Sequence, residues 1–92
     1  MKELIVLNML HDDGACKGRV LAKAAKTDEA TIRAFVNRFR SIGIPVCSSR
    51  EGYYISEDPQ EIQKTIDSME HRIQLMQNAV NGLRIALEGV EA

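Results

Sequence analysis

The chain has 92 residues, of which 45% are hydrophobic, and its aromatic side chains are two phenylalanines and two tyrosines. A chain of this length buries one modest core, so we expect one compact domain with at most one appended element and no large enzyme cleft. It contains no apolar run of the roughly 20 residues that cross a bilayer, and its start lacks a signal-peptide layout. We therefore predict a cytoplasmic protein with no membrane partner.

The net charge of −1 is unevenly divided along the sequence. Residues 1–56 carry nine basic and six acidic side chains, whereas residues 57–92 carry three basic and seven acidic ones. This asymmetry is expected if only the first part approaches phosphate groups. Ordinary solvated surfaces also differ this much between two halves of a chain.

Residues 2–11 are predicted to form a helix, because four of their apolar side chains recur with helical spacing. Those side chains are Leu4, Ile5, Leu7 and Leu10. The Asp-Asp-Gly sequence at 12–14 ends the helix, and residues 15–17 favour a very short strand. A second, short helix is expected at 19–25, where Val20, Leu21 and Ala24 supply the apolar side chains.

A third helix is predicted from the cap residue Asp28 to Ile42, with Gly43 as its stop. Its predicted core face follows the 3.6-residue period and comprises Ile32, Phe35, Val36, Phe39 and Ile42. The opposite face is expected to be free, and it comprises Ala30, Arg33, Ala34, Asn37, Arg40 and Ser41. This helix therefore has one face available for a partner.

Residues 46–55 contain two β-favouring runs around a polar tip with glycine, which predicts a hairpin. The sequence Asp58-Pro59-Gln60-Glu61 then has the features of a helix start, with an acidic cap, proline in the first turn and glutamate three residues after the cap. The helix that begins here is expected to reach Glu88. Gly82 and Gly89 lower its helix propensity and favour fraying or a bend after Asn81.

Apolar side chains in this last helix recur at alternating steps of four and three residues. This heptad stripe consists of Ile62, Ile66, Met69, Ile73, Met76, Val80, Leu83 and Leu87. About 30 helical residues span on the order of 45 Å, so we expect much of the helix to project beyond the N-terminal domain. A second copy of the chain offers the same stripe by symmetry, which predicts a homodimer.

The sequence defines the relative direction of the two helices in this dimer less well than it defines the stripe through which they pair. The stripe consists of two alternating sets of positions. In one of these sets most residues are β-branched, which favours two parallel helices. The flanking positions carry little charge patterning, so antiparallel pairing stays open. A further alternative is that the helix folds back on its own N-terminal domain.

The predicted order of helix, short strand, helix, turn, helix and hairpin is that of a winged helix-turn-helix. Residues 17–56 also resemble the winged-helix domains of bacterial and phage regulators, including the N-terminal domain of biotin-operon repressors. The matching residues are Leu21-Ala22, Asp28, Thr31-Ile32-Arg33, Phe39-Arg40, Gly43-Ile44-Pro45-Val46 and Gly52-Tyr53-Tyr54-Ile55. The cap is Asp28 where the pattern usually has serine, and Glu29 follows it, which places negative charge near the end that would face phosphate.

The resemblance and the order of the predicted elements imply a mainly α fold with a winged helix-turn-helix at 1–57, while the heptad stripe, which lies outside the resemblance, predicts a coiled-coil dimerisation helix at 58–92. Together they predict a homodimeric transcriptional regulator that binds duplex DNA sequence-specifically, with helix 28–42 in the major groove and hairpin 46–55 as the wing. The candidate DNA-binding residues are Lys17, Arg19, Lys26, Ala30, Thr31, Arg33, Asn37, Arg40 and Arg50.

A protein-interaction scaffold and an enzyme are the other classes of function for this sequence. A winged-helix scaffold whose heptad helix binds a different protein remains the alternative, because fold alone does not determine function. An enzyme is not expected, since no nucleophile has a base and an orienting partner at a recognisable spacing. Cys16 and Cys47 are expected to be free buried thiols, and neither His11 nor His71 completes a metal site with them, so no metal or cofactor is predicted.

Overall fold

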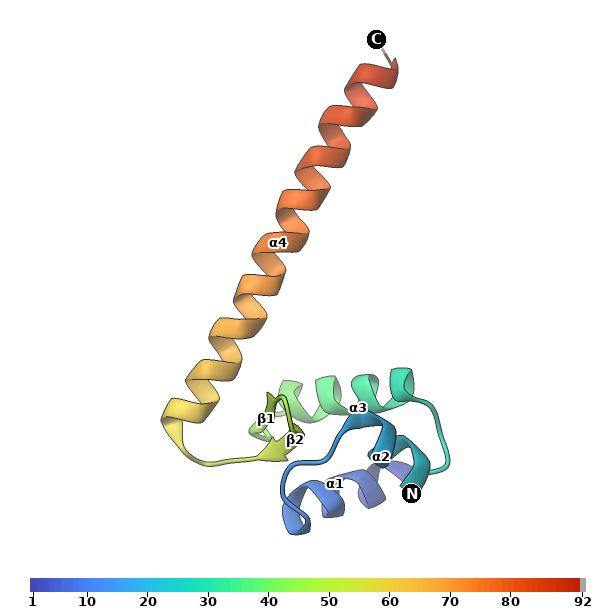
Figure 1. Cartoon of the computed structure of the whole chain (residues 1–92), viewed down its shortest axis with the longest axis vertical. Coiled ribbons are helices and arrows are strands. Elements are labelled where there is room, and N and C mark those ends of the chain that lie inside the picture. The colour runs from blue at the N-terminus through green and yellow to red at the C-terminus, as the bar shows by residue number, and fades with distance from the viewer. Residues whose placement is uncertain (92) are drawn as a thin grey trace. The chain divides into compact units, whose positions relative to one another are not determined.

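A computed structural model describes residues 1–91 and is mainly helical, with one two-stranded sheet. Its elements are α1 (Lys2–Asp12), α2 (Gly18–Ala24), α3 (Glu29–Ser41), β1 (Val46–Ser49), β2 (Gly52–Ile55) and α4 (Pro59–Glu91) (Figure 1). Contacts divide the chain into a compact unit Met1–Ile62, here called the head, and the remainder of α4 from Gln63, here called the tail helix. The predicted helical content, hairpin and long final helix are confirmed.

The face that α1 buries differs from the predicted one. Val6 and Leu10 are buried in the head, whereas Leu4 is 54% exposed and Ile5 is 41% exposed. Leu4 and Ile5, whose spacing predicted a common helical face with Leu7 and Leu10, therefore lie outside the core. Apolar residues lie on nearly every side of α1, so its sequence pattern does not select one face, and packing against the other elements does.

The core of the head is formed mainly by α2 and α3. The buried side chains from these two helices and the turn after α2 are Leu21, Ala22, Ala25, Ile32, Val36 and Phe39. Val20 and Ala24, the other apolar residues of α2 named in the sequence analysis, are exposed. Ile42 is 72% exposed because α3 ends at Ser41, and the chain leaves helical geometry at the cap residue before the predicted face is complete.

A tight turn joins α2 to α3. Lys26 has a positive φ of 55°, and the N–H of Thr27 donates to the carbonyl of Ala22 at 2.9 Å. Asp28 then caps α3, with its carboxylate accepting the N–H of Thr31 at 2.7 Å. The predicted cap is confirmed. Lys2 at the start of α1 donates to the carbonyl of Lys26 at 3.0 Å, which fixes α1 to the same turn.

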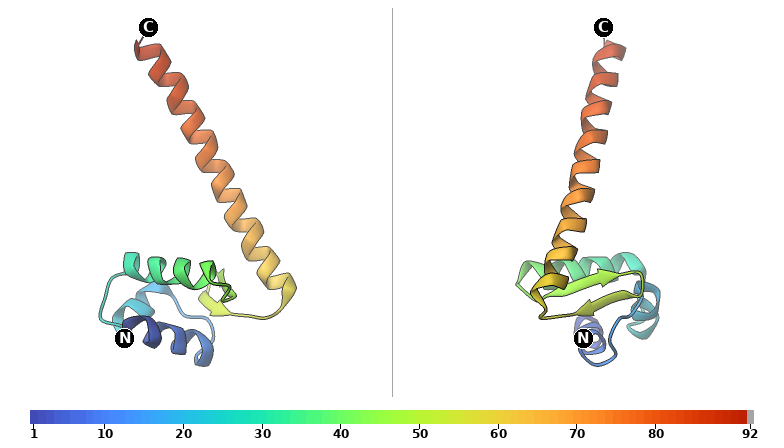
Figure 2. Two further views of the ribbon diagram at one scale, coloured as in Figure 1. Left: turned by 180° about the vertical axis from the view of Figure 1, so that it is seen from behind. Right: turned by 60° about the vertical axis from the view of Figure 1, so that its left-hand side comes forward.

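The hairpin pairs β1 with β2 in antiparallel register, with Val46 opposite Ile55 and Ser49 opposite Gly52 (Figure 2). The strand predicted at 15–17 is reduced to a single pair, in which Cys16 and Tyr53 exchange two backbone hydrogen bonds of 2.8 Å. Gly52 makes this approach possible. Its φ is 121°, and a Cβ there would lie 2.3 Å from the carbonyl carbon of Cys16.

The two cysteines are buried free thiols on opposite edges of β2. Cys16 pairs with Tyr53 on one edge, and Cys47 pairs with Tyr54 on the other. Two strand spacings amount to about 9.5 Å, which exceeds the Cα separation that a disulfide bridges. The fold therefore keeps the thiols apart.

The start of α4 is held by side chains. The carboxylate of Asp58 accepts the N–H of Gln60 at 2.9 Å, and Pro59 is the first helical residue. Glu61 accepts the hydroxyl of Ser56, whose oxygen also accepts the N–H of Asp58. α4 is continuous to Glu91, so it reaches the predicted Glu88 and extends three residues further, and it is not interrupted after Asn81. None of the helices within residues 1–91 is long and apolar enough to cross a membrane.

Phe39 is the aromatic side chain whose burial most clearly tests this core. It is 5% exposed, and Phe39→Ala should lower the free energy of unfolding by about 3–5 kcal/mol, because it removes buried surface and leaves a cavity. Ile42→Ala, three residues further on, is the matched control and should change stability by less than about 0.5 kcal/mol. Urea unfolding would measure both, and equal losses in the two variants would contradict the observed helical phase.

Candidate nucleic-acid interface

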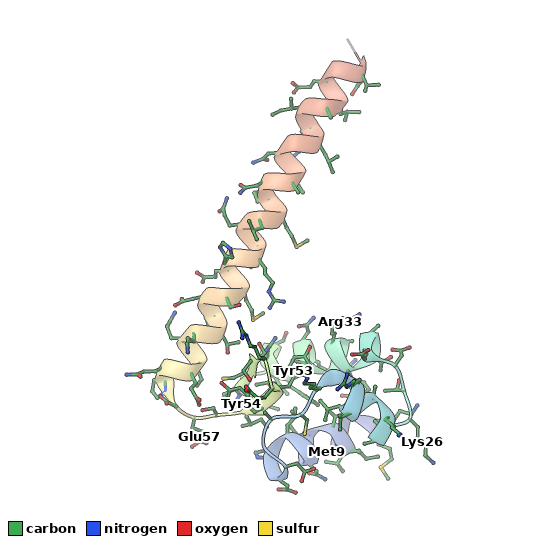
Figure 3. The ribbon with its side chains drawn as sticks, viewed as in Figure 1. Met9, Lys26, Arg33, Tyr53, Tyr54 and Glu57 are labelled. Carbon is green, nitrogen blue, oxygen red and sulfur yellow. The ribbon has the colours of Figure 1, made fainter. Side chains whose placement is uncertain are left out.

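The outward face of α3 is set by the side chains that the core takes from it. Since Ile32, Val36 and Phe39 are buried, the positions opposite them are exposed. Among the predicted DNA-binding residues on this helix, Ala30, Arg33 and Asn37 are exposed and Thr31 is half-buried. Arg33 points away from α1 (Figure 3).

Arg33 and Asn37 are four residues apart, so their side chains are neighbours on one helix face. A guanidinium can donate two hydrogen bonds to the edge of guanine, and an amide can donate one hydrogen bond to adenine and accept one from it. The small side chain of Ala30 leaves room beside them. The structure therefore brings together an exposed polar pair on a rigid helix, as the sequence predicted.

Arg40 has a different environment from the other two. Its Nε donates to the carbonyl of Val46 at 2.7 Å, and its guanidinium carbon lies 6.0 Å from the ring centroid of Tyr53. The side chain is half-buried and joins α3 to both strands of the hairpin. The expectation of a fully outward Arg40 is therefore corrected, because the hairpin offers an acceptor and a ring that compete with solvent.

A second group of cations lies along α2. Lys17 occupies the cap position of this helix, and Arg19 follows it in the first turn, both exposed. Sequence reasoning missed Lys23, which lines the same shallow depression as Arg19, together with Val20 and Ala24. The four-residue spacing of Arg19 and Lys23 was the available signal, since it places them on one helix face.

The start of α2 is also close to an acidic group. A Cβ built on Gly18 would lie 3.5 Å from a carboxylate oxygen of Glu29 and 3.7 Å from the ring of Tyr53. Glu29 therefore sits beside the first turn of α2, whose free backbone N–H groups would otherwise attract a phosphate group. Its negative charge lowers the attraction of that end for a second anion.

The remaining predicted cations are at turns. Lys26 is exposed between α2 and α3, while its backbone carbonyl accepts a hydrogen bond from Lys2. Arg50 is exposed in the two-residue turn of the hairpin. The neighbouring Glu51 is folded back, with its carboxylate accepting the hydroxyl of Ser49 at 3.0 Å. Arg50 and Glu51 are thus both exposed charges of this turn, and Glu51 offsets part of the positive field of Arg50.

The tail helix carries most of the heptad stripe as exposed surface. Its exposed members are Ile66, Ile73, Met76, Val80, Leu83 and Leu87, while Met69 is half-buried. Ile62 belongs to the head and is half-buried. An apolar row of this length on one helix is the geometry of a helix-pairing surface.

No group of three or more histidine, cysteine or acidic side chains within residues 1–91 is arranged to hold a metal ion. Comparison with known proteins found no match to this chain among family models, curated proteins or solved structures. The assignment of a function therefore depends on the residues and their arrangement.

The cap of α3 gives the head a specific pH dependence. Hydrogen bonds from Thr31, with a smaller contribution from Arg33, hold the pKa of Asp28 below its usual value. The unfolded chain therefore takes up this proton first on acidification. The stabilisation by the charged cap is complete above the ordinary carboxyl range, near about pH 4, and is lost as the pH falls through the lower folded-state pKa.

We expect the advantage of wild type over Asp28→Asn in melting temperature to shrink between about pH 5 and about pH 3. Asparagine keeps an acceptor at the cap position but does not titrate, so the difference between the two proteins isolates Asp28 from the other carboxylates. Thermal denaturation followed by circular dichroism provides the measurement. A difference that is constant over this range would contradict the role of the charged cap.

Proposed function

We propose that the head is a winged helix-turn-helix that binds duplex DNA, with α3 as the recognition helix and the hairpin as the wing. The observation that carries this proposal is the exposed pair Arg33 and Asn37 on α3, on the side of the helix away from its buried residues Ile32, Val36 and Phe39. The order of α2, tight turn, α3 and hairpin supports it, because this order presents the second helix of the pair to a major groove.

The proposed contacts fall into two chemical classes. Arg33 and Asn37 read base edges, since a guanidinium matches the two acceptors of guanine and an amide matches adenine. Lys17, Arg19 and Lys26 contact phosphate groups and fix the orientation without reading sequence. Arg50 at the hairpin turn reaches the backbone or a minor groove next to the site.

Arg40 contributes indirectly in this mechanism. Its hydrogen bond to Val46 and its position over Tyr53 hold the wing against the end of α3. Truncating Arg40 should therefore affect the stability of the head together with DNA affinity, whereas truncating Arg33 should affect affinity alone.

We further propose that the protein acts as a homodimer that regulates transcription. The exposed heptad stripe supports the dimer, because a row of large apolar side chains in water favours association with an identical row. Two heads held together recognise two half-sites, and the tether raises the affinity above that of one head. The second candidate, a protein-interaction scaffold, is supported by the same stripe but does not explain Arg33 and Asn37.

The DNA-binding proposal predicts that Arg33→Ala and Asn37→Ala each weaken binding to a selected DNA site about tenfold or more, because a base contact is lost. Their melting temperatures should remain those of wild type, since both side chains are exposed. Lys64→Ala removes a positive charge from the tail helix and is the matched control. Fluorescence anisotropy with labelled duplex at several salt concentrations gives the affinities, and unchanged affinity in both α3 variants would remove this helix from the interface.

The dimer proposal predicts that Ile73→Lys with Met76→Lys dissociates the protein into single chains with folded heads, because the seam would bury four charges. Gln74→Lys with Asn81→Lys adds the same charge off the heptad stripe and should leave association unchanged. Sedimentation equilibrium at micromolar concentration distinguishes the outcomes. A stripe variant that associates like wild type would place the interface elsewhere.

A further inference from the structure

The part of the tail helix after Arg72 carries more apolar surface than the heptad stripe accounts for. No charged residue occurs between Arg72 and Arg84. Leu75 is 52% exposed and Ile85 is 71% exposed, although neither belongs to the stripe. Val90, which continues the stripe by one further step of three residues, is 85% exposed.

The distribution around the helix shows the excess clearly. At about 100° per residue, the apolar side chains and glycines from Ile73 to Val90 cover an arc of about 240°, interrupted only by Asn78. The remaining narrow arc holds the other polar side chains, which are Gln74, Gln77, Asn81, Arg84, Glu88 and Glu91. A helix in a two-stranded coiled coil needs a much narrower apolar face. One partner helix therefore does not cover this section.

A second seam lies within the wide arc. Its residues follow one another at steps of four, three, four and three, which is the heptad spacing of the first stripe. This second seam consists of Leu75, Ala79, Gly82, Ala86 and Gly89. Its centre is about 110° around the helix from the centre of the heptad stripe. A helix that contacts two neighbours in a square bundle of four needs faces separated by about 90°.

The two glycines give a separate indication that another helix covers this face. Each costs about 1 kcal/mol of helix stability relative to alanine. Within the chain itself nothing requires them, because a Cβ on Gly82 or Gly89 would meet no atom within 4 Å. In a bundle, the absence of side chains there allows the backbones of two helices to approach closely.

We propose that the second seam is covered by a second dimer of this chain, so that residues 73–90 of four chains form a four-helix bundle. This proposal rests on the proposed homodimer, which uses the heptad stripe. The two dimers pair in antiparallel orientation across the second seam. Two dimers with two-fold symmetry commonly associate into a dihedral tetramer of this kind.

The sizes of the side chains support the antiparallel orientation. In a pairing centred on Gly82, Leu75 of one chain lies opposite Gly89 of the other, and Ala79 lies beside Ala86. The one large side chain of the second seam thus meets a glycine, as close packing requires. A parallel pairing would place Leu75 against Leu75 and Gly89 against Gly89, with a collision at one end and a void at the other.

The test measures the mass of the full chain by sedimentation equilibrium. Wild type should have four times the 10.3 kDa chain mass. Ala79→Glu with Gly82→Glu should have twice that mass, because the second seam would bury charge while the heptad stripe stays intact. Glutamate has a higher helix propensity than glycine, so the Gly82 substitution does not weaken the isolated helix. Gln74→Glu with Asn81→Glu adds the same charge on the polar arc and should remain tetrameric.

Each other result has a defined meaning. A wild-type mass of two chains would overturn the tetramer and leave the proposed dimer standing. A wild-type mass of one chain would overturn both proposals. A second-seam variant that stays tetrameric would show that the four chains associate through a different surface.

Discussion

The burial of one face of α3 is the constraint on which the rest of the head depends. Ile32, Val36 and Phe39 fill the centre of the core, and their burial fixes the rotation of the helix about its own axis. The exposed positions follow from that rotation, since the core face and the outer face are complementary parts of one helical period. Arg33 and Asn37 are therefore held outward by hydrophobic packing on the opposite side.

Three polar contacts fix the surroundings of α3. Asp28 caps its first turn, Arg38 in its last turn pairs with Glu3 of α1 at 2.5 Å, and Arg40 binds the carbonyl of Val46. The ion pair is mostly solvent-exposed and contributes little to stability by itself. The Arg40 contact is partly shielded from water and is the stronger of the two. A helix with capped and anchored ends suits the proposed DNA-binding surface, whose side chains would have to match the spacing of bases.

In contrast to α3, the tail helix has little packing within its own chain. Its start is well capped and its backbone is regular, but most of its apolar side chains remain exposed in a single chain. Helices in proteins gain most of their stability from packing, so a helix of 33 residues with this surface is expected to have partners. The heptad stripe and the second seam describe how many partners its section after Arg72 can accommodate.

The sequence by itself determined the order of the elements, the caps Asp28 and Asp58, the hairpin and the core face of α3 from Ile32 to Phe39. These features depend on local interactions or on periodicity, both of which the sequence contains. It did not determine which side of α1 is buried, because that helix is apolar nearly all round and only packing selects Val6 over Leu4. It also did not show that Arg40 would turn inward, since its acceptor on Val46 is brought within reach only by the hairpin. The close pairing of Cys16 with Tyr53, and with it the need for glycine at position 52, likewise arose from contacts between distant segments, which the tertiary structure alone decides.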